Sequence, residues 1–148
     1  MNVEEIIKTE RRIPIKSRTI IHTILVYNKI NETLTKALKP FEVSIQQFNV
    51  LRILRGRKGV PANLSTLNER MVSKMSNTTR LVDKLLQKGY VERVVCESNR
   101  RKVEISITPS GEQVLVHMDG TIKMAENELT KNFTKEELEL LNQLLDKF

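Results

Sequence analysis

The most constraining feature of this 148-residue chain is a stretch, residues 64–107, in which two short segments of helical periodicity precede two alternating segments. The first segment predicts a helix from Leu64 to Arg70, because Leu67 and Met71 then face inward together. A second helix should follow after a short turn, and the alternating segments predict a two-stranded ribbon. The stretch is therefore interpreted as a helix-turn-helix followed by a hairpin.

The second helix is expected to begin near Ser76 and to end at Lys88. Ser76 and Asn77 are cap-type residues, whose side-chain oxygens accept the free amide hydrogens of a first helical turn. Gly89 supplies the left-handed residue that ends a helix. Spacings of three, four and seven place an inward face on Thr78, Leu81, Val82 and Leu85.

The opposite face of this helix is polar. Its residues are Ser76, Asn77, Thr79, Arg80, Lys84 and Gln87. A short helix with small polar groups and an arginine at its exposed N-terminal end suits insertion into the major groove of DNA. An ordinary amphipathic helix with a solvated polar face has the same pattern, so the helix alone does not decide.

The ribbon adds a second feature of this kind. Residues 90–95 are rich in β-branched side chains, and residues 102–107 alternate so that one face packs and the other meets water. Between them, residues 97–101 form a polar tip that carries Arg100 and Arg101. Such a tip can place a guanidinium in the minor groove or on phosphates. The alternative is a charged loop that is kept soluble by its arginines.

These segments resemble the MarR family of winged helix-turn-helix transcription regulators. The resemblance lies within residues 44–111, close to half the chain, and is carried by SIQQFNVL, LNERM, TRLVDKL, KGYVER, the paired arginines and VEISITPSG. The family usually has an Asp just before the paired arginines. This chain has Asn99 there, which offers a neutral hydrogen bond in place of a charged one.

The resemblance implies a fold class that is mostly α with a small antiparallel β-wing (α+β). We expect a single domain over residues 1–148, with a DNA-binding unit over about residues 44–111. Dimerisation helices are expected over about residues 12–40 and 110–148. Members of the family commonly repress transcription as homodimers, and many release DNA when they bind a small, often aromatic, anion or when a thiol is oxidised. The ligand pocket usually lies between the dimer helices and the winged domain.

Composition and charge agree with that expectation. The net charge of +7 is concentrated in residues 44–111, which hold 13 basic and 5 acidic residues, whereas residues 112–148 hold 4 and 8. Such polarity is expected when one end of a fold meets a polyanion, although RNA, a membrane surface or an acidic partner would also attract a basic patch. No membrane span or signal peptide is expected, and a single cysteine fits a reducing cytoplasm.

The flanking segments predict helices with wide apolar stripes. One is expected over residues 15–38, with Pro14 in its first turn and Pro40 after its end. A long helix should start after Thr108 or Ser110 and run to about Leu129. A last helix should start at Thr134, with an apolar stripe formed by Leu138, Leu141, Leu144, Leu145 and Phe148. Packing between two chains is preferred over packing within one chain for these stripes.

Between these flanks, Ser44 and Gln47 form a capping-box pattern that starts a helix over residues 45–54. Residues 55–61 then form a basic turn that contains glycine and proline. We interpret this turn as a solvated loop, with phosphate contact as the alternative.

No catalytic constellation is visible, so no enzyme activity, cofactor or metal is expected. His22, His117 and Cys96 lie at no metal-ligand spacing, and a metal site built from all three after folding is the alternative. Cys96, near the arginines of the tip, is interpreted as a small strand-end residue, with a redox-sensing thiol as the alternative.

The predicted partner is double-stranded DNA with a pseudo-palindromic operator, whose half-sites a homodimer would contact about 34–36 Å apart. We expect base or nearby phosphate contacts from Ser76, Asn77, Thr79 and Arg80, and minor-groove or backbone contacts from Arg100 and Arg101. Lys74 and Lys84 are expected to neutralise phosphates. The alternative function is a winged-helix module that binds protein or RNA without operator specificity.

Overall fold

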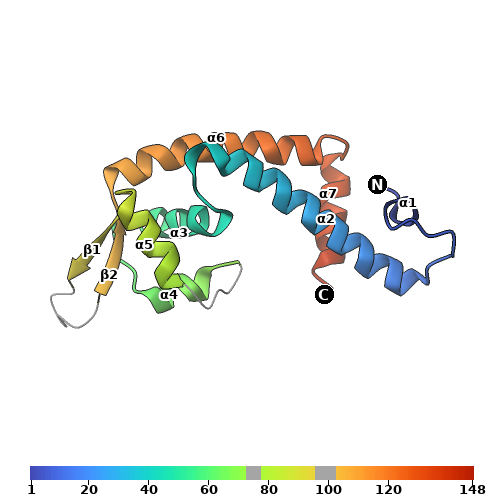
Figure 1. Cartoon of the computed structure of the whole chain (residues 1–148), viewed down its shortest axis with the longest axis horizontal. Helices are drawn as coiled ribbons and strands as arrows, with labels where there is room; N and C mark the ends of the chain where they lie inside the picture. The colour runs from blue at the N-terminus through green and yellow to red at the C-terminus, as the bar shows by residue number, and fades with distance from the viewer. Residues whose placement is uncertain (73–77, 96–102) are drawn as a thin grey trace. The chain divides into compact units, whose positions relative to one another are not determined.

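The computed structural model describes residues 1–72, 78–95 and 103–148, which divide into two compact units. One unit contains Met1–Leu34 and Lys123–Phe148, and the other contains Thr35–Ile122. Within the described ranges the chain is mostly helical, with one two-stranded antiparallel sheet (Figure 1). The predicted fold class, mostly α with a small β-wing, is confirmed. The predicted division into a DNA-binding unit and dimerisation helices stays a prediction.

The unit Thr35–Ile122 contains the helices α3 (Ile45–Gly56), α4 (Leu64–Arg70) and α5 (Thr78–Gln87). Its strands are β1 (Val91–Val95) and β2 (Val103–Ile107), and they pair antiparallel with Val91 opposite Ile107. Helix α3 packs against α4, α5 and β2, while α5 packs against β1. Figure 1 shows the three helices gathered beside the ribbon. The fully buried side chains of this unit include Leu38, Val50, Leu51, Leu67, Leu85, Ile105, Leu115 and Met118.

Helix α3 begins with the predicted capping box. The amide of Gln47 donates to the Ser44 hydroxyl at 3.2 Å, and the amide of Ser44 donates to the Gln47 side chain at 2.9 Å. The helix was predicted to end at Leu54 but continues through Gly56. The first positive φ after α3 occurs at Lys58, followed by Gly59, and such left-handed residues typically end a helix.

The flanking helices have the predicted positions. They are α2 (Ile15–Leu38), α6 (Pro109–Thr130) and α7 (Lys135–Leu145), and a short 3-10 turn that contains Pro40 follows α2. Helix α7 begins after the predicted Thr134, which forms a capping box with Glu137. Pro14 was placed in the first turn of α2 but precedes it, and its carbonyl accepts from the amide of Arg18 at 2.9 Å. No helix in the described ranges is long and apolar enough to cross a membrane.

Large apolar side chains remain exposed on α2 and α7. They are Ile15, Ile20, Ile24, Val26, Tyr27 and Ile30 on α2, and Leu140, Leu141, Leu144 and Leu145 on α7. The exposed fractions of Tyr27 and Leu144 are 61% and 49%. Exposed apolar side chains in such number on two helices leave much apolar surface in contact with water.

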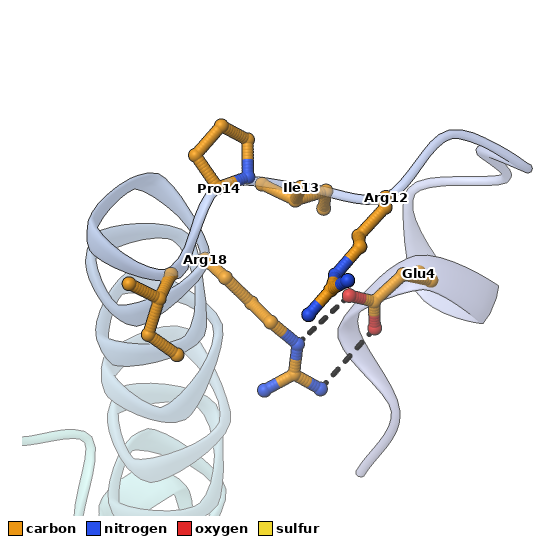
Figure 2. A pocket seen from close by; sticks show the side chains of 6 residues that line it. Glu4, Arg12, Ile13, Pro14 and Arg18 are labelled. Carbon is orange, nitrogen blue, oxygen red and sulfur yellow. Dashed lines mark hydrogen bonds and ion pairs between the residues drawn. The ribbon is translucent and has the colours of Figure 1, made fainter.

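Residues 1–12, for which no structure was predicted, contain a four-residue helix, α1 (Val3–Ile6). Asn2 caps α1 by accepting from the amide of Glu4, and Val3 is fully buried. The Arg18 guanidinium on α2 holds Glu4 through two hydrogen bonds, Nε to Oε1 at 2.8 Å and Nη2 to Oε2 at 3.2 Å (Figure 2). A helix this short depends on such a tertiary contact, because its own hydrogen bonds do not stabilise it.

Candidate nucleic-acid interface

Helix α4 has the predicted bounds and supports the helix that follows it. Asn63 caps its N-terminus by accepting from the amide of Thr66 at 2.8 Å. Leu67 and Met71 are buried, as predicted, with exposed fractions of 0% and 4%. The side chain of Asn68 accepts a hydrogen bond of 3.3 Å from the Thr78 hydroxyl, which joins α4 to the first residue of α5. The start of α5 is therefore fixed against α4 by packing and by a polar contact.

Helix α5 is strongly amphipathic, as the sequence predicts. Thr78, Val82 and Leu85 are buried, and Leu81 is half-buried. On the opposite face, Thr79, Arg80, Lys84 and Gln87 are exposed. The helix ends at Gln87, one residue before the predicted Lys88, and Gly89 has the predicted left-handed φ of +70°. The predicted start at Ser76 lies outside the described residues.

The end of α5, the start of β1 and the start of α6 meet at a close junction. The Thr108 hydroxyl donates to the carbonyl of Gly89 at 2.6 Å, and the amide of Thr108 donates to the carbonyl of Tyr90 at 3.1 Å. Thr108 also caps α6, because its hydroxyl accepts from the amide of Gly111. A Cβ at Gly111 would lie 2.0 Å from the carbonyl oxygen of Tyr90, so only glycine fits there.

An ion pair connects the ribbon to α5. The Arg93 guanidinium of β1 donates through Nη2 to Oδ1 of Asp83 on α5 at 3.0 Å. Both side chains are about half exposed, with exposed fractions of 60% and 46%. The contact fixes the base of the ribbon relative to the exposed face of α5, although a pair this exposed contributes little to stability.

The predicted packing face of the ribbon is buried only at its base. Val91 and Ile105 are 2% and 1% exposed, whereas the opposed pair Val95 and Val103 are 65% and 53% exposed. The helices that cover the sheet contact its base, so alternation further along the ribbon does not lead to burial.

Ala62 adds a bridge on the other side of β2. Its amide and carbonyl exchange hydrogen bonds of 2.9 and 2.8 Å with Ile105. Residues at the centre of β2 are therefore held between β1 and the segment that precedes α4.

The structure brings three of the predicted contact residues together on one surface. Thr79, Arg80 and Lys84 lie on the exposed face of α5, and Arg80 and Lys84 are one turn apart. The other predicted contact residues lie outside the described residues: Lys74, Ser76, Asn77, Arg100 and Arg101. Their roles stay predictions.

Sequence reasoning missed the Asp83–Arg93 pair. The signal was present, because Arg93 stands two residues from both Val91 and Val95 and so shares their face of the strand. A charge on that face needs a partner where it approaches the helices. The partner was not predictable from spacing, since α5 and β1 meet only in the folded unit.

The basic turn at residues 55–61 holds two of its arginines in protein contacts. Arg55 forms an ion pair with Asp119 of α6. Arg57 donates to the carbonyls of Val60 and Pro61 at 2.9 Å each. Both guanidinia therefore have protein partners: Arg57 binds carbonyls within the turn, and Arg55 binds α6.

The described residues contain no group of three or more His, Cys, Asp and Glu side chains that would hold a metal ion. His117 is exposed on α6 and His22 is half-buried on α2. Cys96 lies outside the described residues, so the alternative metal site is untested.

Comparisons with known proteins agree with this geometry. The model of the MarR family matches residues 43–103. The chain is 30% identical over 125 residues to the multiple antibiotic resistance protein MarR of Salmonella typhimurium, a match that covers 83% of this chain and 85% of the relative.

Two solved structures are also similar over most of their length. A putative MarR-like transcription regulator from Bacillus cereus has 28% identity and a TM-score of 0.78, with 90% of this chain and 96% of that chain covered. A mutant MarR from E. coli, solved in complex with operator DNA, has 28% identity and a TM-score of 0.75, with 90% and 93% covered.

Proposed function

Because the chain belongs to the MarR family of transcription regulators, we propose that it binds double-stranded operator DNA sequence-specifically. The observation that carries the proposal is the exposed face of α5, where Thr79, Arg80 and Lys84 stand opposite a buried face. Arginine and small polar side chains are the groups that contact base edges in the major groove. The similar MarR from E. coli, which was solved with operator DNA, supports the same use of this fold.

The proposed contact residues divide into three groups by the part of the DNA that they contact. Ser76, Asn77, Thr79 and Arg80 contact bases or nearby phosphates, and Lys74 and Lys84 neutralise phosphates. Arg100 and Arg101, at the tip of the wing, contact the flanking minor groove or the backbone. The Asp83–Arg93 pair supports this arrangement, because it ties the wing-bearing ribbon to the helix that enters the groove.

The active form in this proposal is a homodimer on a pseudo-palindromic site. The exposed isoleucines of α2 and leucines of α7 support it, since a second chain would remove this apolar surface from water. Two-fold symmetry would then present two α5 helices to successive major grooves.

The proposed activity is repression in the cytoplasm, relieved by a small-molecule or oxidative signal. Repression follows if the dimer occupies a promoter. Relief requires that the signal favours a dimer geometry with lower affinity for DNA. We assign the chain no catalytic role.

The decisive experiment selects binding sites from genomic DNA and then titrates the best site with variants. Arg80→Ala should lower affinity by on the order of 1–3 kcal/mol if Arg80 pairs with guanine. Gln87→Ala is the matched control, because Gln87 is also exposed on α5 but lies at its C-terminal end. The proposal fails if no sequence is enriched, as expected of an RNA- or protein-binding module, or if Arg80→Ala binds the selected site like the wild type.

A further inference from the structure

A small apolar hollow lies between α5 and the two-stranded ribbon, and one of its lining residues is a proposed DNA contact. Its volume is about 200 Å³. Its lining includes Thr79, Val82 and Asp83 of α5, Arg93 of β1, and Val103 and Ile105 of β2. All of these residues belong to the unit Thr35–Ile122, in which Figure 1 shows α5 beside the ribbon. The hollow is therefore formed within one compact unit.

The lining combines buried and exposed apolar groups. Val82 and Ile105 are 2% and 1% exposed, so they belong to the packed core beneath the hollow. Thr79 is exposed, and Val103 is 53% exposed. Both of these side chains end in methyl groups, and they come from different elements, α5 and β2. Apolar surface on both sides of the hollow thus remains open to a partner.

Charge and size limit what the hollow can bind. Asp83 and Arg93 are the ionisable groups among its described lining residues, and they form an ion pair of 3.0 Å with each other. Their charges cancel, so the hollow offers no net charge to a free anion or a phosphate. Its volume also lies below the roughly 300–1,000 Å³ of small-molecule sites. The hollow therefore fits a neutral apolar group of a few atoms.

Duplex DNA presents such a group in the major groove. The base edges there carry hydrogen-bond donors and acceptors, and thymine adds an apolar C5-methyl group that threonine methyls and other apolar side chains contact. Thr79 precedes Arg80 on the exposed face of α5, the face proposed to enter the groove. A base edge that approaches Thr79 therefore also approaches the hollow.

We propose that this hollow binds the C5-methyl group of one thymine in each operator half-site. The inference rests on the proposed function, because it assigns base specificity to the same DNA-binding surface. The γ-methyl of Thr79 contacts the thymine methyl from α5, and the methyls of Val103 contact it from β2. A base without this methyl group leaves the apolar surface of the hollow uncovered, which lowers the affinity.

The test removes single methyl groups from the DNA. In the operator selected from genomic DNA, each thymine is replaced in turn by deoxyuridine, which lacks only the C5-methyl group. Binding to the full chain is followed by fluorescence titration. At one position in each half-site, the replacement should weaken binding by about fourfold, the value for one buried methyl group. Replacements at other positions should give losses that do not depend on the hollow.

Three variants of the chain show whether the hollow causes that loss. Thr79→Ser removes one methyl group and keeps the hydroxyl, and Val103→Thr replaces a methyl group with a hydroxyl of similar shape. In both, the loss caused by deoxyuridine at that position should fall to about twofold or less, because the two methyl contacts are coupled. Val95→Thr is the matched control, since Val95 is the exposed cross-strand partner of Val103 and does not line the hollow. It should keep the full loss.

The inference is overturned if the wild type binds its operator and no deoxyuridine weakens binding. It is also overturned if the loss is unchanged in Thr79→Ser or in Val103→Thr, or if Val95→Thr suppresses it equally. A chain that selects no operator refutes the proposed function and this inference together. Normal operator binding without a deoxyuridine effect refutes this inference alone.

Discussion

Arg93 of β1 and Asp83 of α5 are joined by a hydrogen-bonded ion pair of 3.0 Å, although ten residues separate them in the chain. Along the sequence of α5, Asp83 precedes the exposed Lys84 directly and follows the exposed Arg80 by three residues, about one helical turn. The pair therefore couples the orientation of the ribbon to that of the proposed DNA-binding face.

A double-mutant cycle on this pair separates positioning from stability. Asp83→Asn and Arg93→Gln should each lower the free energy of unfolding by about 0.2–1 kcal/mol, since the pair is half exposed. Affinity for the selected operator should fall in both, and the two losses should not add. Chemical denaturation and fluorescence titration measure the two quantities. Additive losses in operator affinity would show that the two side chains do not act as a pair.

Lys84 is expected to act on DNA through charge alone. The logarithm of the DNA-binding constant falls linearly with the logarithm of the salt concentration. Lys84→Ala should make this slope less steep by about 0.9, the value for one phosphate contact on duplex DNA. Its effect should be similar for operator and random DNA. The measurement is a series of titrations at increasing salt concentration. An unchanged slope, or a loss restricted to the operator, would contradict the assignment.

Leu144→Lys should disrupt the proposed homodimer. Leu144 is 49% exposed in the single chain. The lysine that replaces it would bury an unpaired ammonium group in a dimer interface. Sedimentation equilibrium should give an association constant lower by roughly tenfold or more. Gln143→Lys adds the same charge to the neighbouring exposed residue of α7 and serves as the control. Equal association of wild type and Leu144→Lys would exclude α7 from the interface.

Gly111 and Gly120 should respond in opposite directions to alanine. Gly111→Ala places a methyl group against the carbonyl of Tyr90, so the chain should lose roughly 1–3 kcal/mol of unfolding free energy. Gly120 lies inside α6 with nothing within 4 Å of the added Cβ, so Gly120→Ala should gain about 0.5–1 kcal/mol. Thermal denaturation of both variants provides the comparison. A neutral effect at Gly111 would mean that the junction with Tyr90 is looser than the structure indicates.

The attachment of α1 should depend on pH. The Arg18 guanidinium lowers the pKa of Glu4 below its ordinary value of about 4.3. The stabilisation of α1 by this ion pair is therefore complete above about pH 4.3, and it is lost as the pH falls through the lowered pKa of Glu4. Amide NMR signals of Val3 and Ile6 should then shift toward those of a free chain. Glu4→Gln removes the titrating group, so its spectrum should show no such transition. A transition that persists in Glu4→Gln would assign the effect to another group.

The elements that the sequence predicted correctly have local causes. The capping boxes at Ser44 and Thr134 and the left-handed Gly89 each depend on residues within one helical turn. The exposure of Arg80 and Lys84 follows from helical periodicity in the same way. This is why the bounds of α2 and α4, and the polar face of α5, were predictable.

The features that the sequence did not predict depend on distant contacts. Helix α1 is tied to α2 through Glu4 and Arg18, and the ribbon is tied to α5 through Asp83 and Arg93. Neither pairing follows from a periodic pattern. The exposure of Val103 also depends on distant contacts. The alternation of apolar and polar residues predicts which face of the strand packs, but it does not predict how far the helices extend along that face.

The bridge between Ala62 and Ile105 has a consequence for self-association. An open sheet edge presents unpaired backbone groups to which a strand of another molecule can add, and this is a common route to aggregation. Here the middle of β2 already exchanges both hydrogen bonds with Ala62, and Pro61 next to it has no amide hydrogen to donate. A foreign strand would have to displace that segment before it could pair along β2, so the ribbon is protected against fibril growth from that side.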